Sequence, residues 1–142
     1  MKKIILVSVV ILSVVALFTA NAGNSAANSN SATSSVAKVE VYYFHFTRRC
    51  VTCQAVETES QKAIAALYPA QYKSGKITFK SLNLDESSSK ALAEKCKAEG
   101  QQLLIISGNK RFDLTEQGFM YARSNPDKLK QDLKTTIDPL IK

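Results

Sequence analysis

The 142-residue sequence has no internal repeat of the kinds that indicate fibrous or solenoid proteins. It has no heptad pattern, no collagen-like glycine period and no repeated unit of about 20–50 residues. The basic residues do not form a run either, although the formal net charge is +7, and in residues 90–99 lysines are interspersed with acids. A nucleic-acid surface needs clustered Lys and Arg with exposed aromatics. We therefore expect no nucleic-acid partner and a single small domain.

Metal ligands are also scarce, because the chain has one histidine, His45, and three cysteines. Structural zinc sites commonly use two ligand pairs, whereas this sequence has one CxxC pair, Cys50 and Cys53. Two thiolates suit Cu(I), so a soft-metal module for Cu(I) or Zn remains an alternative function. His45 lies in an apolar run, where we expect a buried imidazole rather than a ligand. We assign no metal and no other cofactor.

Residues 1–22 are typical of an export signal, with two lysines before an apolar stretch over residues 4–18. This stretch is short for a membrane-spanning helix, which needs about 20 residues, and no cysteine follows it as in a lipoprotein. We expect cleavage after Ala22, which makes the protein periplasmic or extracellular, and membrane attachment only through an uncleaved signal. Residues 23–37 are uncharged and rich in Ser, Asn and Ala, which predicts a flexible linker before a domain over 38–142.

The domain sequence alternates strand and helix patterns. The apolar, β-branched run 39–46 predicts a strand buried on both faces, and helical spacing after Cys50 predicts a helix that ends at Pro69. The later predicted elements are a strand (77–84), a helix (85–99), a strand (103–106), a hairpin strand (111–115) and a helix from Pro126 with Leu129, Leu133 and Ile137 on its apolar face. This β-α-β-α-β-β-α order predicts an α/β fold with a central mixed sheet. Residues 117–125 are interpreted as a loop that binds a partner or covers the sheet edge.

A CxxC motif between the first strand and the first helix is typical of thioredoxin-like redox proteins. Residues 79–86, FKSLNLDE, resemble the second core strand of thioredoxins, and residues 103–110, LLIISGNK, resemble their next strand and turn. Residues 39–142 thus resemble the thioredoxin-like superfamily. The resemblance implies a thioredoxin-like fold and a thiol–disulfide oxidoreductase that acts on protein thiols or disulfides and exchanges electrons with a partner. We expect a monomer.

The sequence departs from thioredoxin at several family positions. Arg49 replaces the tryptophan before the motif, residues 51–52 are Val-Thr instead of Gly-Pro, and Phe44 stands where the family has a buried carboxylate. Gln101 replaces the cis-proline, and a non-proline cis bond costs about 2.5–4 kcal/mol, so we expect a trans bond. We assign Gln101 and Gln102 to the substrate loop. A binding protein that kept the fold without turnover is a second alternative function.

The position of the CxxC motif predicts unequal roles for its two cysteines. Cys50 should begin the helix, where the dipole favours an anion, and Arg48 and Arg49 add positive charge that should lower the pKa of its thiol. We expect Cys50 to be the attacking thiol and Cys53 the resolving thiol, with Arg49 exerting the stronger effect. A static disulfide is the opposing interpretation, although so short a loop adds little stability.

The third cysteine, Cys96, lies on the same helical face as Leu92. We expect it to be buried and inert, the alternative being a third redox thiol near Gln101. Whether the protein oxidises, reduces or isomerises its substrates depends on its reduction potential, which the sequence leaves open.

Overall fold

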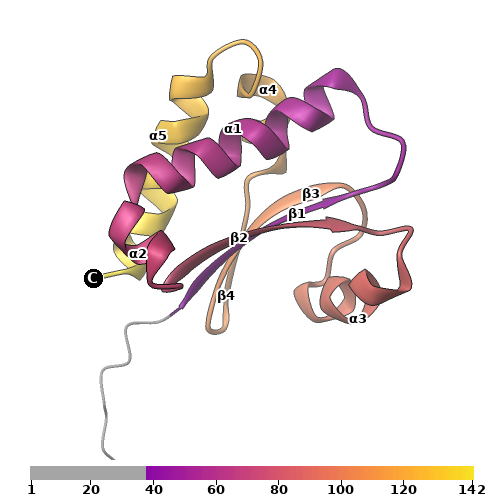
Figure 1. Ribbon diagram of the computed structural model, residues 1–142, viewed down its shortest axis with the longest axis horizontal. Coiled ribbons are helices and arrows are strands. Elements are labelled where there is room, and N and C mark those ends of the chain that lie inside the picture. The colour runs from indigo at the N-terminus through magenta and orange to yellow at the C-terminus, as the bar shows by residue number, and fades with distance from the viewer. Residues whose placement is uncertain (1–37) are drawn as a thin grey trace, which may run out of the picture. The chain divides into compact units, whose positions relative to one another are not determined.

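The computed structural model describes residues 38–142 (Figure 1), so the predicted signal at 1–22 and linker at 23–37 lie outside the described residues. The described chain forms these elements in order: β1 (Val39–His45), α1 (Val51–Leu67), α2 (Pro69–Lys73), β2 (Ile77–Asn83), α3 (Ser87–Cys96), β3 (Gln102–Ser107), β4 (Lys110–Asp113), α4 (Thr115–Tyr121), α5 (Pro126–Ile137) and the short 3-10 helix η1 (Asp138–Leu140). No helix within residues 38–142 is long and apolar enough to cross a bilayer.

The four strands form an open mixed sheet in the order β2-β1-β3-β4. β1 pairs in parallel with β2, with Val41 opposite Phe79, and antiparallel with β3, with Val41 opposite Ile105. β4 pairs antiparallel with β3 and forms one edge. The predicted α/β class with a mixed sheet is therefore confirmed.

β1 lies between β2 and β3 in the sheet, and both of its faces are covered. Its odd-numbered residues, such as Val41 and Tyr43, belong to the larger core under α1 and α5, whereas Tyr42 and Phe44 belong to a smaller core with α3. Figure 1 shows α1, α4 and α5 on one face of the sheet and α3 on the other. The nearly continuous apolar run of β1 therefore reflects burial on two sides, as predicted.

The C-terminal helix forms as the sequence predicts. Pro126 occupies the first turn of α5, where its missing N–H costs nothing, and the Asn125 side chain accepts a hydrogen bond from the Lys128 N–H at 3.2 Å. Apolar residues at helical spacing, Leu129, Leu133 and Ile137, are fully buried in the larger core.

Two predicted boundaries are wrong. Residues 115–121, part of the predicted hairpin strand and loop, form α4. The helix predicted to reach residue 99 ends at Cys96, because Lys97 adopts a left-handed conformation (φ 52°) and Ala98 donates its N–H to the Ala93 carbonyl at 2.8 Å. This bond closes the helix end with lysine in the position usually taken by glycine.

Candidate active site

Both cysteines of the CxxC motif lie at the N-terminus of α1, just after β1 and a short loop. Cys50 is the N-cap residue, and its Sγ accepts a hydrogen bond from the Cys53 N–H at 3.1 Å. The Cys50 N–H lies 3.2 Å from the Cys53 Sγ, and the two residues form a disulfide with their Cα atoms 5.0 Å apart. The Cys50 sulfur thus occupies the place of a capping oxygen, where N–H groups and the helix dipole stabilise negative charge.

The two cysteines differ in exposure. Cys50 is exposed, whereas Cys53 is only 6% exposed. Two large apolar side chains in the sequence around Cys50 are also open to solvent: Phe46 is 43% exposed and Val51 66% exposed. An incoming sulfur can therefore reach Cys50 but not Cys53, and it arrives beside apolar surface.

Arg49, the predicted tuning residue next to Cys50, is held by an ion pair with Glu57. Both side chains are 25% exposed, so water only partly screens the pair. Glu57 lies four residues after Cys53 on α1, which places the two side chains on the same helix face. Arg48, in contrast, is exposed. Glu57 is a site residue that sequence reasoning missed, and its only signal was this helical spacing.

The predicted substrate loop contacts β1, the strand before the CxxC motif, through Tyr43. Gln101 donates from Nε2 to the Tyr43 hydroxyl at 2.7 Å, and the Tyr43 side chain is fully buried on β1. Burial raises the pKa of the Tyr43 phenol, and the nearby Arg49 charge offsets part of that rise. The loop is thereby tied to the strand that leads to Cys50.

Gln102 makes other contacts than Gln101. Its Nε2 donates to Asp113 Oδ2 at 3.0 Å, and its Oε1 accepts the Glu99 N–H at 3.0 Å. Its side chain therefore links the α3–β3 connection to β4. Its role toward a substrate stays a prediction.

The loop between β1 and α1 is fixed to the end of β2. The Thr47 N–H donates to Asp85 Oδ2 at 2.8 Å, and Asn83 donates from Nδ2 to the Thr47 hydroxyl at 3.0 Å. The Leu84 N–H also donates to the His45 carbonyl at 2.7 Å. The bonds from Thr47 lower the pKa of Asp85. These contacts position the chain that enters Cys50.

In the part of the chain that the structure describes, the CxxC pair has no further metal ligand. Within residues 38–142, no three His, Cys, Asp or Glu side chains gather as a metal site would require. The His45 Nδ1 donates to the carbonyl of the next residue, Phe46, at 2.9 Å, so this nitrogen is engaged by the neighbouring backbone. The residue expected to be a buried imidazole is partly exposed, because it ends β1 at the margin of the core.

Cys96 is a buried free thiol at the end of α3, as the sequence predicts. Burial raises the pKa of its thiol, and the charge of Glu40 raises it further. It belongs to the smaller core together with Tyr42, Phe44 and Leu104. Cys96 therefore lies on the opposite face of the sheet from α1.

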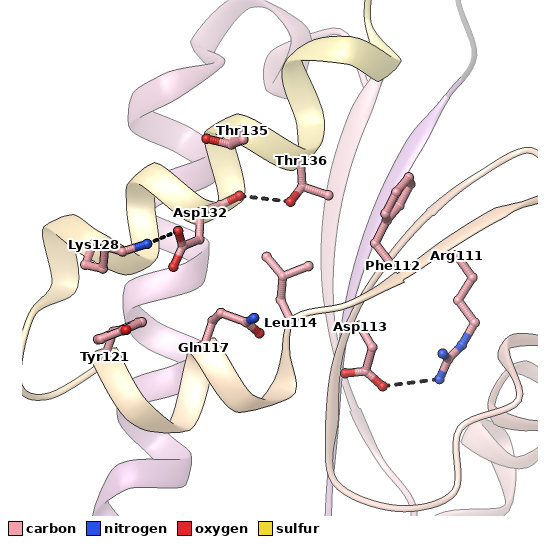
Figure 2. Close-up of a pocket in the computed structure, with 10 residues that line it drawn as sticks. All are labelled: Arg111, Phe112, Asp113, Leu114, Gln117, Tyr121, Lys128, Asp132, Thr135 and Thr136. Carbon is pink, nitrogen blue, oxygen red and sulfur yellow. Dashed lines mark hydrogen bonds and ion pairs between the residues drawn. The ribbon is translucent and has the colours of Figure 1, made fainter.

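A cavity of about 600 Å³ between β4, α4 and α5 has no cysteine in its lining (Figure 2). Its charged side chains are already paired: Lys128 binds Asp132, and Arg111 Nη2 lies 3.5 Å from Asp113 Oδ2. It therefore has no part in the chemistry of the disulfide.

The sequence matches no family model and none of the curated proteins with which it was compared.

Proposed function

We propose that this chain is an exported, thioredoxin-like thiol–disulfide oxidoreductase that acts on protein thiols or disulfides through Cys50 and Cys53. The observation that carries the proposal is the unequal exposure of two bonded cysteines, the outer of which caps a helix. A purely structural role explains the pair less well, because closing so short a loop removes little chain entropy and adds little stability.

The topology supports the same proposal. The sheet order β2-β1-β3-β4, with a parallel β1–β2 pair and an antiparallel β3–β4 hairpin, is compatible with a thioredoxin-like core. Helices cover both faces, and the CxxC motif follows the central strand. A disulfide also fits the oxidising compartment to which the predicted signal would deliver the chain.

The exchange conserves atoms and electrons. A substrate thiolate attacks the Cys50 Sγ, the Cys50–Cys53 bond breaks, and Cys53 leaves as a thiolate. A second substrate thiolate then attacks the substrate sulfur of the mixed disulfide and releases Cys50. The substrate loses two electrons and becomes a disulfide, while the protein gains them as two thiols. In the reverse direction, the Cys50 thiolate attacks a substrate disulfide and Cys53 resolves the adduct.

The proposal is tested by trapping. With Cys53→Ser, the Cys50 thiolate should form a mixed disulfide with a disulfide-bonded protein such as insulin, and the adduct should persist because no resolving thiol remains. With Cys50→Ser, the buried Cys53 should form no adduct. Adducts are counted by mass spectrometry after acid quenching. Equal trapping by the two variants would show that the roles are not divided in this way.

A further inference from the structure

A second hollow, a groove of about 710 Å³, lies on the α3 face of the sheet. It extends from the C-terminal end of α3 to the β3–β4 hairpin, and Lys38 and Glu40 place it at the start of β1, whereas Cys50 follows the end of β1 (Figure 1). The groove is therefore separate from the candidate active site. Its lining includes five cationic side chains: Lys38, Lys95, Lys97, Lys110 and Arg111.

The positive charge of the groove is largely uncompensated. Its one acidic lining residue, Glu40, is already paired with Lys38 Nζ at 3.0 Å. Among residues 38–142, no carboxylate pairs with the lysines of the rim, Lys95, Lys97 and Lys110. Of the other two cations of the groove, Lys38 pairs with Glu40 and Arg111 Nη2 lies 3.5 Å from Asp113 Oδ2, so the unpaired charge is that of the three rim lysines.

The arginine of the groove is engaged within the protein. Arg111 donates from Nε to the Cys96 carbonyl at 3.0 Å and from Nη2 to the Lys97 carbonyl at 3.4 Å. Its guanidinium therefore offers no free fork for a compact phosphate, which arginine would grip with two parallel bonds. The charges available to a ligand are therefore those of the separate rim lysines. Separate ammonium groups can each bind one carboxylate of an extended chain.

The floor of the groove is apolar. It contains the partly buried side chains of Leu92 and Ile106, together with Tyr42 (3% exposed) and Cys96 (5% exposed). Sites for single-stranded nucleic acids use exposed aromatic rings for stacking, whereas the aromatic ring of this floor, Tyr42, is buried. A peptide with an aliphatic side chain between acidic residues would complement both parts of the groove: the aliphatic group the apolar floor, and the acids the lysines of the rim.

We propose that this groove docks an acidic peptide segment of a partner protein, with an aliphatic side chain on the floor and carboxylates on the lysines of the rim. Complementary charge of this kind speeds association and selects the partner more than it adds affinity. The groove and the disulfide lie at different ends of β1, so docking leaves Cys50 open. This inference is independent of the redox proposal.

The first test uses the oxidised full-length chain, in which Cys96 is the one free thiol. The probe is a fluorescent peptide with one leucine between pairs of glutamates; control peptides replace the glutamates with glutamine or the leucine with serine. We expect anisotropy to report binding of the first peptide only, weakening as salt rises. Bound peptide should also slow the labelling of Cys96 by N-ethylmaleimide, a neutral reagent.

The second test changes the protein. The double variant Lys97→Glu, Lys110→Glu should weaken binding about tenfold, because two attractions become repulsions. The control Lys73→Glu, Arg123→Glu makes the same charge change at exposed positions outside the groove and should weaken binding less than about twofold. Circular dichroism verifies that both variants are folded.

Three results would overturn the proposal. Equal weakening by the two double variants would show general electrostatic attraction without a site. Unchanged labelling of Cys96 at saturating peptide would place the peptide elsewhere. Single-stranded DNA that binds as tightly as the peptide and is lost in the same variant would make the groove a nucleic-acid site. Each result leaves the trapping experiment with Cys50 unaffected.

Discussion

The N-terminus of α1 and the C-terminus of α3 both hold a cysteine, and the two ends give this side chain opposite properties. Cys50 is exposed and accepts an N–H bond at the positive end of a helix dipole. Cys96 is buried at the negative end of another helix, where burial and the charge of Glu40 raise the pKa of its thiol. The two residues are chemically identical, so the difference comes from their surroundings. In our proposal Cys50 is a nucleophile, whereas Cys96 is an inert core thiol.

The largest expected difference between the two helix ends is the rate of thiol alkylation. In the reduced chain at pH 7, iodoacetamide should modify Cys50 about 100-fold faster than Cys96, because thiolate character and exposure both favour Cys50. The Cys96 rate should keep rising above pH 9.0, the ordinary cysteine value, because its pKa is raised. Peptide mapping against time and pH measures both rates. Comparable alkylation rates of Cys50 and Cys96 at pH 7 would show that the two helix ends do not give their cysteines different reactivity.

Removing the side chain that binds the C-terminal end of α3 should have a smaller effect, on both stability and the labelling of Cys96. Arg111 binds the last carbonyls of α3, at Cys96 and Lys97. Its replacement by alanine should lower the free energy of unfolding by about 1–3 kcal/mol, as expected for hydrogen bonds to a charged group. In the oxidised chain it should also raise the labelling rate of Cys96 several-fold.

The matched control for this change is Arg123→Ala, which removes an exposed arginine without touching α3. Urea unfolding and maleimide labelling of the two variants test the effect. Identical stability and labelling would mean that Arg111 does not secure this helix end.

The smallest expected effects concern the charges beside Cys50. Arg49→Ala should slow alkylation of Cys50 at pH 6 by about two- to threefold, because a cation that favours the thiolate is lost. Glu57→Gln should accelerate it to a similar degree, since it removes the partner that neutralises Arg49. Arg48→Ala, at an exposed position, should change the rate less.

These effects of Arg49 and Glu57 should shrink as salt rises, because charges that solvent reaches are screened over about 10 Å at 0.1 M ionic strength. Iodoacetamide rates at low and high salt test this directly. A decrease in rate for Glu57→Gln would contradict the assigned direction.

Much of the fold could be predicted because its signals are local. The nearly continuous apolar run of β1 predicted burial on both faces, and Pro126 with the spacing of Leu129 and Leu133 predicted α5. The start of α1 at the CxxC motif followed from the same kind of pattern.

The missed features depend on contacts between distant residues. Residues 117–125 were predicted to be a loop, yet α4 extends over Gly118, where an added Cβ would lie 3.1 Å from Val56 Cγ1 and 3.3 Å from Leu103 Cδ2, so the close packing of this helix requires glycine. The Arg49–Glu57 pair joins a loop residue to a helix residue eight positions later, and no pattern encodes that meeting. The Gln101–Tyr43 bond spans 58 residues. Such features arise from packing and become visible only in three dimensions.

The reduction potential of the Cys50–Cys53 pair tests the central claim most directly. The oxidised chain is equilibrated with glutathione buffers of defined ratio, quenched with acid, and the free thiols of the pair are counted by mass. We predict a potential between about −120 and −270 mV, the range of disulfides that exchange with protein substrates. A potential below about −300 mV, where structural disulfides resist the glutathione pool, would contradict the account.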